Sequence, residues 1–498
     1  MTGPPALIDQ VRRLLGSAQE AAAGTPTQER IRGLAARLDE PLRVAIAGKV
    51  KAGKSTLLNA LVGQALAPTD AGECTRIVTW YRDGVTYRAT LIPQEGESVE
   101  VPLAHDGGAI RVDLQGRTAA DVNRLVIDWP SPSLREMTLI DTPGIASASV
   151  DVSQRATDFL LSEDGSPEST DAVLYLMRHL HSTDVSFLEA FSDREVSRAT
   201  PINAIGILSR ADEVGVGKLD SMATAQRIAG RYRQQPSVRR LCQTVLPVAG
   251  LLAEAGATFR EEEFRGLARI AAAEDRDMAA LLLSTDRFLA GSGVIELGQA
   301  ERESLLGRLG MFGVRASVAL IRKKAAPDAG GLAAHLVRMS GLPQVRAVLA
   351  SQFAARRDVL KARAALASLE ALVREGQVPG GLDAEIERIR SGAHEFAEIR
   401  LLNALRAGAV GLRPEEAQEA ERLLGAEGTA APARLGLPEG ASPEEVRKAL
   451  DAAMARWQSR AEHPLAKQDA VLAARVLVRT CEGLLSALES APAVSGPD

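Results

Sequence analysis

The sequence predicts an α/β fold in which a mostly parallel sheet has helices on both faces and the two chain ends add a bundle of helices. Three observations predict it. Between residues 42 and 248, short runs rich in Val and Ile alternate with helical stretches, a pattern typical of parallel strands joined by helices. The first 40 residues carry apolar side chains at helical spacing, and the chain beyond about residue 250 is almost wholly helical.

The composition is that of a folded protein. Of the 498 residues, 46% are hydrophobic and 25% are charged, as in ordinary soluble domains. The net charge is −5 and aromatic residues make up 3%. We therefore expect no nucleic-acid partner, because the sequence indicates neither a cationic field nor a stacking platform. The three cysteines lie far apart, which predicts neither a disulfide framework nor a zinc site.

The localisation expected from the sequence is cytoplasmic. No segment resembles a signal peptide. No uninterrupted apolar run reaches the roughly 18 residues of a membrane-spanning helix. Any membrane contact should therefore be peripheral, at the inner face of the plasma membrane.

Two helices are expected in the first 40 residues. Leu7, Val11 and Leu14 recur at intervals of three and four residues. Gly24 ends this pattern, and Thr25-Pro26 then supplies an N-cap and a first helical residue.

The expected strands follow. Turn signals between residues 77 and 114 predict antiparallel hairpins at one edge of the sheet. The expected strands are 42–47, 77–81, 87–92, 99–103, 110–114, 137–140, 172–177, 202–208 and 244–248.

Helices dominate the remainder. A long amphipathic helix should begin near Pro343, with Arg356 and Arg357 on its solvated face. Residues 425–440, rich in Gly, Ala and Pro, predict a loop or linker. A last helix is expected over about 471–488.

A glycine-rich loop follows the first expected strand and precedes a helix, in the pattern GxxxxGK[ST]. Gly48 permits the sharp turn, and Gly53 lets backbone N–H groups approach phosphate oxygens. Lys54 should reach the β- and γ-phosphates, and Ser55 should bind Mg²⁺. The residues assigned to nucleotide binding here are Gly48, Lys49, Val50, Lys51, Ala52, Gly53, Lys54, Ser55 and Thr56.

Two further segments complete an expected magnesium site. Thr75 lies 20 residues after Ser55, in a loop ahead of an edge strand, where it can close over Mg²⁺ and the γ-phosphate. Asp141 follows the 137–140 strand and can hold a Mg²⁺-bound water, and the N–H of Gly144 can bond the γ-phosphate. We therefore assign Ser55, Thr75 and Asp141 to the metal.

The segment Ser209-Arg210-Ala211-Asp212 selects the base. Guanine offers two adjacent N–H donors that a carboxylate accepts, whereas adenine presents an acceptor at N1, so Asp212 predicts GTP and GDP over ATP. The Arg210 stem can cover the base plane, and backbone N–H groups near guanine O6 can come from the next strand end. The residues assigned to the base are Ser209, Arg210, Asp212, Ala249 and Gly250.

Together these motifs resemble the bacterial branch of the dynamin family, over nearly the whole chain. The residues that carry the resemblance are 48–55 with Thr56-Leu57-Leu58-Asn59-Ala60-Leu61, then Cys74-Thr75-Arg76, Asp141-Thr142-Pro143-Gly144 and 209–212. The resemblance implies a GTPase that forms a homodimer through its GTPase domain when nucleotide binds, and a role in membrane remodelling. It divides the chain into neck helices at 1–40, a GTPase domain at 41–350 with a helical insertion at about 251–340, a helical neck and short trunk at 351–490, and a flexible tail at 491–498.

Two departures from common patterns bear on catalysis. Ile145 follows Gly144, where many small GTPases have a water-positioning glutamine. Turnover should therefore be slow for the isolated chain and rise on self-association. Val50 and Lys51 replace the Gln-Ser pair of many dynamins, and we hypothesise that Lys51 supplies a positive charge near the bridge between the β- and γ-phosphates. The catalytic residues assigned are Lys54, Thr75 and Lys51.

The membrane contact expected of the family has one candidate. The chain beyond the neck is short for a trunk with a membrane-inserting tip, and no strongly apolar paddle is visible. Arg322-Lys323-Lys324 could meet acidic lipids, although cations are also favoured at an ordinary helix C-terminus.

Two other functions stay open. The chain could be a GTP-binding regulatory partner of a second dynamin-like chain, with poor hydrolysis of its own. It could also be an ATPase with a deviant phosphate loop, because Lys49 lies at the position of the signature lysine of such loops.

Overall fold

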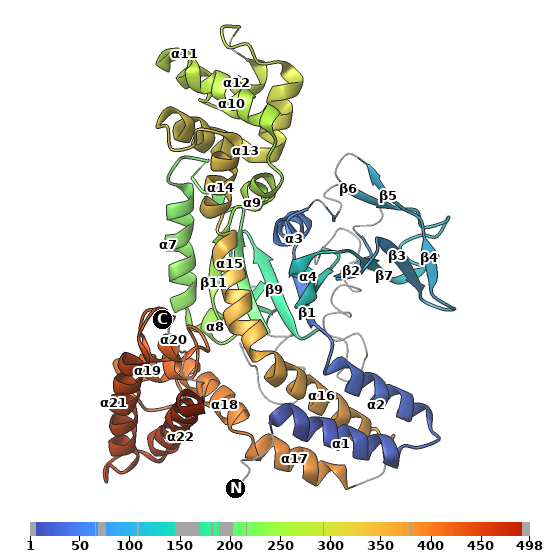
Figure 1. Ribbon diagram of the computed structural model, residues 1–498, viewed down its shortest axis with the longest axis vertical. Coiled ribbons are helices and arrows are strands. Elements are labelled where there is room, and N and C mark those ends of the chain that lie inside the picture. The colour runs from blue at the N-terminus through green and yellow to red at the C-terminus, as the bar shows by residue number, and fades with distance from the viewer. Residues whose placement is uncertain are drawn as a thin grey trace, which may run out of the picture.

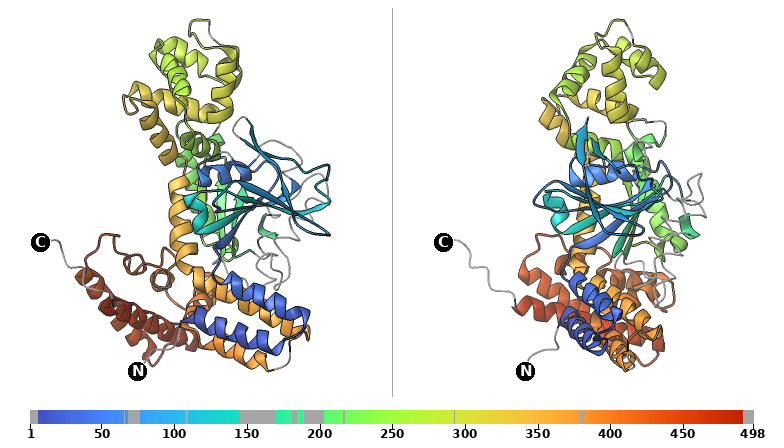
Figure 2. Two further views of the ribbon diagram at one scale, coloured as in Figure 1. Left: turned by 45° about the vertical axis from the view of Figure 1, so that its right-hand side comes forward. Right: turned by 90° about the vertical axis from the view of Figure 1, so that its right-hand side faces the viewer.

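The computed structural model is an elongated molecule with a sheet at its centre and helices at both ends (Figures 1 and 2). A helical lobe built from the insertion lies at one end, and helices from both chain ends lie at the other (Figure 1). The structure describes residues 6–64, 66–67, 76–106, 109–144, 170–180, 184–186, 188, 203–215, 217–291, 293–378 and 381–490.

A nine-stranded sheet of order β11-β10-β9-β1-β8-β2-β7-β3-β4 forms the centre. Strands β11, β10, β9, β1 and β8 are mutually parallel. Strand β2 is antiparallel to β8 and parallel to β7, and β3 is antiparallel to β7 and β4. The expected α/β class, with an antiparallel edge, is confirmed. The strands are β1 (Leu42–Gly48), β2 (Val78–Arg82), β3 (Arg88–Pro93), β4 (Val99–Val101), β7 (Val122–Asp128), β8 (Met137–Asp141), β9 (Ala172–Met177), β10 (Ala204–Ser209) and β11 (Val245–Val248), with β5 (Leu103–Asp106) and β6 (Ala109–Val112) as a separate hairpin.

Helices bury both faces of the parallel half of the sheet. Val44 and Ile46 of β1 belong to one core with helix α3 (Lys54–Val62). Ala45 and Ala47 belong to a second core with helix α7 (Ser221–Gln234). Because successive side chains of a strand point to opposite faces, every residue of β1 is buried. This double burial explains why the central strands are continuous apolar runs rather than alternating ones.

The antiparallel edge differs from the expectation in two places. The sequence pattern does not predict β7, because polar Asn123 and Arg124 interrupt its apolar run. In the fold, the Arg124 guanidinium lies over the Trp80 ring, 5.1 Å from the centroid, so the charge is accommodated against the sheet. The expected 99–103 strand is divided at Pro102, which has no N–H to donate to a neighbouring strand.

The insertion forms a lobe with its own core around Phe288, Leu309 and Phe312. Among the described residues, α13 is the one helix long and apolar enough to cross a bilayer, but it contributes to this core and is kinked at Gly310 (φ 64°). A soluble core helix passes the same length and composition test. The lobe consists of α9 (Gly250–Ala257), α10 (Glu261–Ala272), α11 (Asp275–Leu281), α12 (Thr285–Ala290), α13 (Gln299–Arg322) and α14 (Ala329–Met339).

Helices from both chain ends pack against one another, as expected. The N-terminal pair is separated at Gly24, whose φ is 77°. Thr25 does not cap the second helix through its side chain, because its hydroxyl donates to the Ala22 carbonyl at 2.7 Å. The first helix packs on the second and on two C-terminal helices; the four are α1 (Leu7–Ala21), α2 (Pro26–Arg37), α16 (Arg357–Arg374) and α17 (Leu382–Gly392).

The long helix expected from Pro343 is not continuous. It begins as α15 (Leu342–Val348), then passes through a π-helical turn and a 3₁₀ turn over 349–356 before α16. The solvated face expected there is also wrong. Arg356 is 8% exposed and donates to the carbonyls of Leu424 and Gly425, and Arg357 donates to two carbonyls at the end of the N-terminal helices. Both guanidinium groups donate hydrogen bonds to backbone carbonyls of segments that are distant in the sequence. Local periodicity cannot reveal such contacts.

A second helical bundle ends the described chain. The stretch 425–440 is not wholly a loop, because it contains the short helix α20. The bundle contacts the sheet domain through Glu421, which pairs with Arg239 of α8 (Pro236–Arg239) and with Arg406. The expected flexible tail, 491–498, lies outside the described residues. The bundle helices are α18 (His394–Arg406), α19 (Pro414–Leu423), α20 (Ala431–Leu435), α21 (Pro443–Ala461) and α22 (Gln468–Ser490).

Candidate nucleotide-binding site

The phosphate loop joins β1 to α3, and its glycines occupy positions that no other residue fits. A Cβ on Gly48 would lie 2.5 Å from the Leu176 carbonyl oxygen, and the φ of Gly48 is 149°. Gly53 precedes the helix with φ 94°. Both residues therefore meet the requirement for glycine that the motif predicts. The loop delivers the chain to the N-terminus of α3, where free N–H groups favour an anion.

Lys54 begins α3 and turns its ammonium back over the loop. The Nζ atom donates to the carbonyls of Gly48 at 3.3 Å and Lys49 at 3.5 Å. Burial lowers the pKa of Lys54, and the nearby Asp141 carboxylate opposes that shift. The ammonium thus lies between the loop carbonyls and an acid, within the phosphate-binding part of the site.

Asp141 ends β8 beside α3, and its carboxylate is buried. Its Oδ2 accepts a hydrogen bond from the Ser55 hydroxyl at 2.8 Å. Its Oδ1 is buried without a hydrogen-bond partner among the described residues. Burial raises the pKa of Asp141, against the lowering effects of Lys54 and Ser55. A hydroxyl and a partly unsatisfied carboxylate are hard oxygen donors that suit Mg²⁺, so these two residues fit the ion. Thr75, the third expected ligand, lies outside the described residues.

Gly144 brings the segment after β8 into contact with the phosphate loop. A Cβ on Gly144 would lie 2.5 Å from Val50 Cγ2 and 2.9 Å from Val50 Cα. Only glycine allows this approach, so the Gly144 backbone lies beside the phosphate end of the site, as the motif requires. Thr142 fixes the same segment, because its hydroxyl donates to the Ile46 carbonyl of β1 at 2.9 Å.

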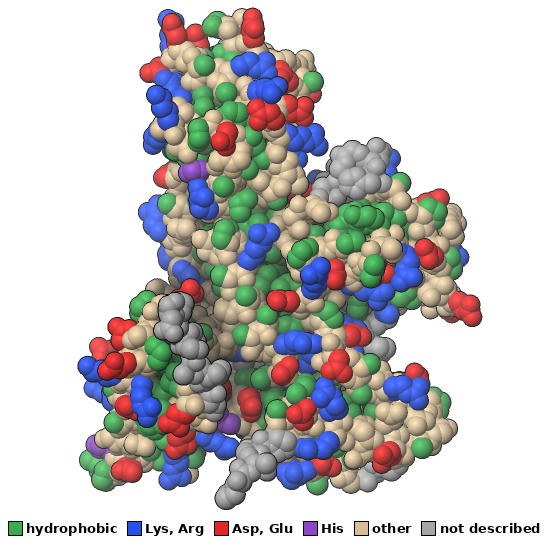
Figure 3. All heavy atoms as spheres, viewed as in Figure 1, with side chains coloured by type: hydrophobic (Ala, Val, Ile, Leu, Met, Phe, Trp, Pro, Cys, Tyr) green, Lys and Arg blue, Asp and Glu red, His purple; other side chains and the backbone are tan. Residues whose placement is uncertain are grey.

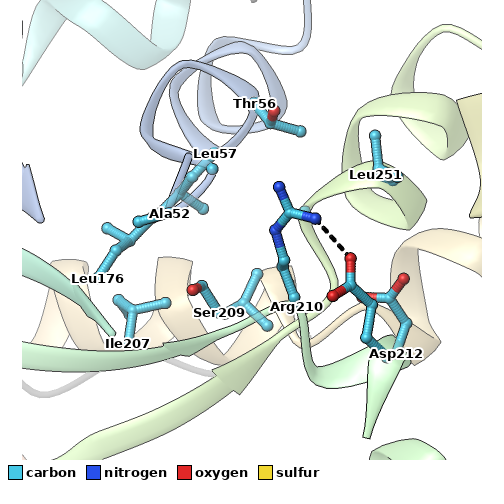
Figure 4. A pocket seen from close by; sticks show the side chains of 13 residues that line it. Ala52, Thr56, Leu57, Leu176, Ile207, Ser209, Arg210, Asp212 and Leu251 are labelled. Atoms are coloured by element: carbon cyan, nitrogen blue, oxygen red, sulfur yellow. Dashed lines mark hydrogen bonds and ion pairs between the residues drawn. The ribbon is translucent and has the colours of Figure 1, made fainter. Parts of the chain in front are cut away.

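The base end of the site is built from side chains at the end of β10. Asp212 is 5% exposed, and burial raises the pKa of its carboxyl to about 6. The Ser209 hydroxyl is buried and has no hydrogen-bond partner within the described part of the chain. Arg210 pairs with Glu213 at 2.6 Å and donates to the Lys51 carbonyl at 3.1 Å, so its stem spans from the base end to the phosphate loop. Figure 4 shows these side chains around one pocket.

The pocket between the two ends has a volume of about 90 Å³. Ala52, Thr56 and Leu57 face it from the phosphate loop and α3, opposite Ser209 and Asp212 (Figure 4). Apolar side chains supply the walls that the flat faces of a base require. The lining residues are Ala52, Gly53, Thr56, Leu57, Leu176, Ile207, Ser209, Arg210, Asp212, Glu213, Val248, Gly250 and Leu251.

Ala249 does not fit the role expected for it. Its N–H donates to the Ser340 carbonyl at 2.9 Å, and it does not line the pocket. Gly250, the next residue, does line the pocket and begins α9. Gly250 therefore remains the candidate for a backbone N–H donor at this strand end. The N–H of Ala249 is already used in the contact between α14 and β11.

Three loop residues, Lys49, Val50 and Lys51, do not line the pocket. The Lys49 ammonium pairs with the buried carboxylate of Asp184 at 3.1 Å, and Tyr175 also donates to Asp184 at 2.9 Å. Val50 is 47% exposed, and Lys51 is exposed with φ 62°. Lys49 is therefore held by a carboxylate that also accepts a hydrogen bond from Tyr175 of β9.

Sequence reasoning missed several residues around the site. Asp184 and Tyr175 hold Lys49, and Asn59 and Glu254 join α3 to α9 by a hydrogen bond of 2.8 Å. Asn59 is the polar residue in the otherwise apolar segment 57–62 of α3, a signal that could have been followed. No local signal links Glu254 to Asn59 or Asp184 to Lys49, because the members of each pair are more than 100 residues apart in the sequence. No cluster of three or more His, Cys, Asp or Glu that could hold a metal occurs among the described residues.

A glycine loop ending in Lys-Ser, a carboxylate at the neighbouring strand end and a buried acid at the base end define a P-loop domain for guanine nucleotides. The model of the Dynamin family matches residues 44–210. The isoniazid-induced protein IniC of Mycobacterium tuberculosis is 40% identical over 488 residues, which cover 96% of this chain and 98% of that protein. The chain therefore belongs to the dynamin family, in the bacterial dynamin-like group that includes IniC-type proteins.

Two shorter sequence similarities agree with this membership. A bacterial dynamin-like protein of Nostoc punctiforme is 29% identical over 114 residues, 21% of this chain and 16% of that protein. The isoniazid-induced protein IniA of Mycobacterium tuberculosis is 30% identical over 159 residues, 29% of this chain and 24% of that protein. A solved structure of an oligomerised bacterial dynamin pair matches 99% of this chain and 77% of its own, with 12% identity and a TM-score of 0.31.

Proposed function

We propose that this dynamin-like GTPase binds GTP with Mg²⁺ and hydrolyses it to GDP and phosphate. One observation carries the proposal: a single pocket is bounded by the phosphate loop and α3 at one end and by the buried carboxylate of Asp212 at the other. A nucleoside phosphate needs both ends at once, because the anion binds at the helix N-terminus and the base at the acid.

The base end favours guanine. Two adjacent N–H groups of guanine match the two oxygens of Asp212, and burial strengthens such charge-assisted hydrogen bonds. The pKa of about 6 leaves Asp212 ionised at neutral pH. The Arg210 stem, held between Glu213 and the Lys51 carbonyl, covers the base plane.

The phosphate end supplies the catalytic charges. Ser55 and Asp141 would hold Mg²⁺ together with Thr75, and that ion would neutralise the β- and γ-phosphates. Lys54 would leave its loop carbonyls to reach the same oxygens. The Gly144 N–H would bond the γ-phosphate, and Lys51 would place a further positive charge near the bridge oxygen. None of these groups orients water, so we expect slow turnover by the isolated chain.

Dimerisation through the nucleotide face and a movement of the neck would couple hydrolysis to work on membranes. The neck is joined to the sheet domain through α15, which leads into α16 by way of the turns at 349–356. A second dynamin-like chain is an alternative partner.

The direct lipid contact proposed at Arg322-Lys323-Lys324 has less support, because Arg322 pairs with Asp275 and the two lysines follow the C-terminus of α13. On the face shown in Figure 3, acidic and basic side chains are interspersed rather than gathered into one cationic field. We propose a cytoplasmic protein with peripheral membrane association.

The test combines calorimetry with turnover measurements on the apo protein. GTP and GDP should bind in the presence of Mg²⁺, and ATP should bind at least about tenfold more weakly. Turnover per molecule should rise with protein concentration. A flat, near-zero rate with intact GTP binding would support the regulatory-partner function, and a preference for ATP would support the deviant-loop ATPase. No uptake of any guanine nucleotide would overturn the proposal.

A further inference from the structure

A partly buried polar link joins α3, at the phosphate end of the pocket, to α9, at the base end. Asn59 lies on α3 and is 1% exposed. Its Nδ2 donates to Glu254 Oε1 of α9 at 2.8 Å and to the Ala67 carbonyl at 3.1 Å. Its Oδ1 accepts from the N–H groups of Leu66 at 2.9 Å and Ala67 at 2.7 Å. The Asn59 amide thus uses both donors and both acceptor positions.

Helices α3 and α9 meet at the pocket, because each of them begins there. Helix α3 starts from the phosphate loop with Lys54, and α9 starts with Gly250, which lines the base end. A Cβ on Gly250 would lie 3.3 Å from Thr56 Cγ2, so the two N-termini are in close contact. About one turn further along each helix, Asn59 and Glu254 form the only hydrogen bond recorded between the described side chains of α3 and α9.

Helix α9 is fixed on its other sides. Gly256 lies so close to α14 that a Cβ there would be 2.8 Å from Val337 Cγ2. A Cβ on Gly313 of α13 would lie 2.7 Å from Leu252 Cδ1. Because α9 is packed tightly within the lobe, a hydrogen bond from α9 to α3 sets the position of α3 relative to the lobe.

Glu254 is half-buried, and its partial removal from water raises the pKa of its carboxyl, against the lowering effects of Asn59 and of Arg308 on α13. Removing a carboxylate from water is costly unless the carboxylate is hydrogen-bonded or paired, so the bond from Asn59 offsets part of that cost. Neither Glu254 nor Asn59 lines the pocket, so neither can contact a nucleotide there.

We propose that Asn59 and Glu254 are positioning residues that fix the separation of the phosphate end and the base end of the pocket. This inference rests on the proposed function, because it describes how the same pocket grips a whole nucleotide. Ligands that touch both ends depend on the link, whereas a ligand that touches the phosphate end alone does not.

The test replaces the hydrogen-bond donor at residue 59 with an acceptor, and then replaces the acceptor at residue 254 with a donor. In Asn59→Asp, one carboxylate oxygen keeps the N–H groups of Leu66 and Ala67. The other faces Glu254, so the two acids repel, and it can no longer donate to the Ala67 carbonyl. In the double variant Asn59→Asp with Glu254→Gln, the new amide can donate to the aspartate and restore the link. We expect the Kd for GDP with Mg²⁺, measured with a fluorescent analogue, to rise about tenfold in the single variant. In the double variant it should return to within about threefold of wild type, because the bond between α3 and α9 is restored and the bond to the Ala67 carbonyl is not.

Three controls make the result specific. Inorganic triphosphate with Mg²⁺ should bind the single variant as it binds wild type, because it occupies the phosphate end alone. Glu254→Gln alone should bind GDP nearly normally, since its amide oxygen still accepts from Asn59. Glu262→Ala, a change of an exposed acid on neighbouring α10, should have no effect. Glu254→Ala provides a second disrupting variant if Asn59→Asp does not fold, with the same expected loss for GDP and none for triphosphate.

The outcomes separate this inference from the proposed function. If wild type binds guanine nucleotides and both disrupting variants bind GDP equally well, the positioning role is wrong. It is also wrong if triphosphate affinity falls in step with GDP affinity, or if the double variant is not rescued. If wild type itself takes up no guanine nucleotide, the proposed function fails first.

Discussion

The phosphate end and the base end of the pocket are built by different means. At the phosphate end, Gly48, Gly53 and Gly144 occupy positions where a Cβ or an ordinary φ is excluded, so the backbone itself forms the binding surface. At the base end, one buried carboxylate at Asp212, with a raised pKa, carries the selectivity. The difference teaches that the phosphate end is specified by conformation, and the base end by a charge that burial makes costly.

The largest effect should come from the side chain that completes the phosphate end. Lys54→Met removes the one ammonium held among the loop carbonyls. We expect GTP turnover to fall about 100- to 1,000-fold, the range found when one transition-state donor is removed. Single-turnover assays at saturating GTP would measure it. A loss below about tenfold would mean that backbone groups alone suffice at this end.

The base end should respond by changing its preference. In Asp212→Asn, the amide presents one donor where guanine also presents a donor, so GDP affinity should fall about 10- to 100-fold. Xanthosine diphosphate, which carries an acceptor at that position, should gain affinity. Competition binding of the two nucleotides to both proteins measures the exchange, with Glu262→Gln, a change of an exposed acid outside the pocket lining, as the control. Equal losses for both nucleotides would contradict base recognition by Asp212.

The same contrast predicts a pH dependence confined to the base end. The carboxyl of Asp212 has a pKa of about 6 in the fold against an ordinary value of 3.8. Guanine needs the ionised form, so GDP affinity should fall by up to about tenfold for each pH unit below 6 and be level above it. Inorganic triphosphate, which does not reach Asp212, should not show this decline with the same midpoint.

The free energy of unfolding should change with pH in the opposite sense to GDP affinity: it should fall as pH rises toward 6. A carboxyl with a raised pKa in the fold binds more protons than the unfolded chain between about pH 4 and pH 6. Its contribution to the free energy of unfolding is therefore lost as pH rises through this window. Asp212→Asn should remove this component from a pH series of urea unfolding curves.

The smallest effect should come from Lys51. Its side chain is exposed, and an exposed charge contributes about 1 kcal/mol or less. Lys51→Ala should slow GTP turnover about two- to fivefold while GDP affinity stays within about twofold of wild type. Unchanged turnover would remove Lys51 from catalysis and leave the phosphate end dependent on Lys54, the metal ligands and the backbone.

The sequence by itself determined the parts of this protein whose physics is local. A glycine requirement, a helix N-terminus and an acid directly after an apolar strand are properties of adjacent residues, so the phosphate loop, Asp141 and Asp212 could all be recognised from spacing. The parallel half of the sheet and the N-terminal helices followed from periodicity for the same reason.

Only the tertiary structure decided which long-range partners the polar groups meet. It directs Lys49 to Asp184, uses the Ala249 amide in packing, breaks the expected helix at 349–356 and joins Asn59 to Glu254. It also ties the neck to the sheet through buried Asp171, which accepts from the Arg43 N–H at 2.8 Å and lies 3.4 Å from the Arg37 guanidinium. Each of these choices depends on atoms brought together by burial across long stretches of chain, and burial is a property of the whole fold rather than of any segment.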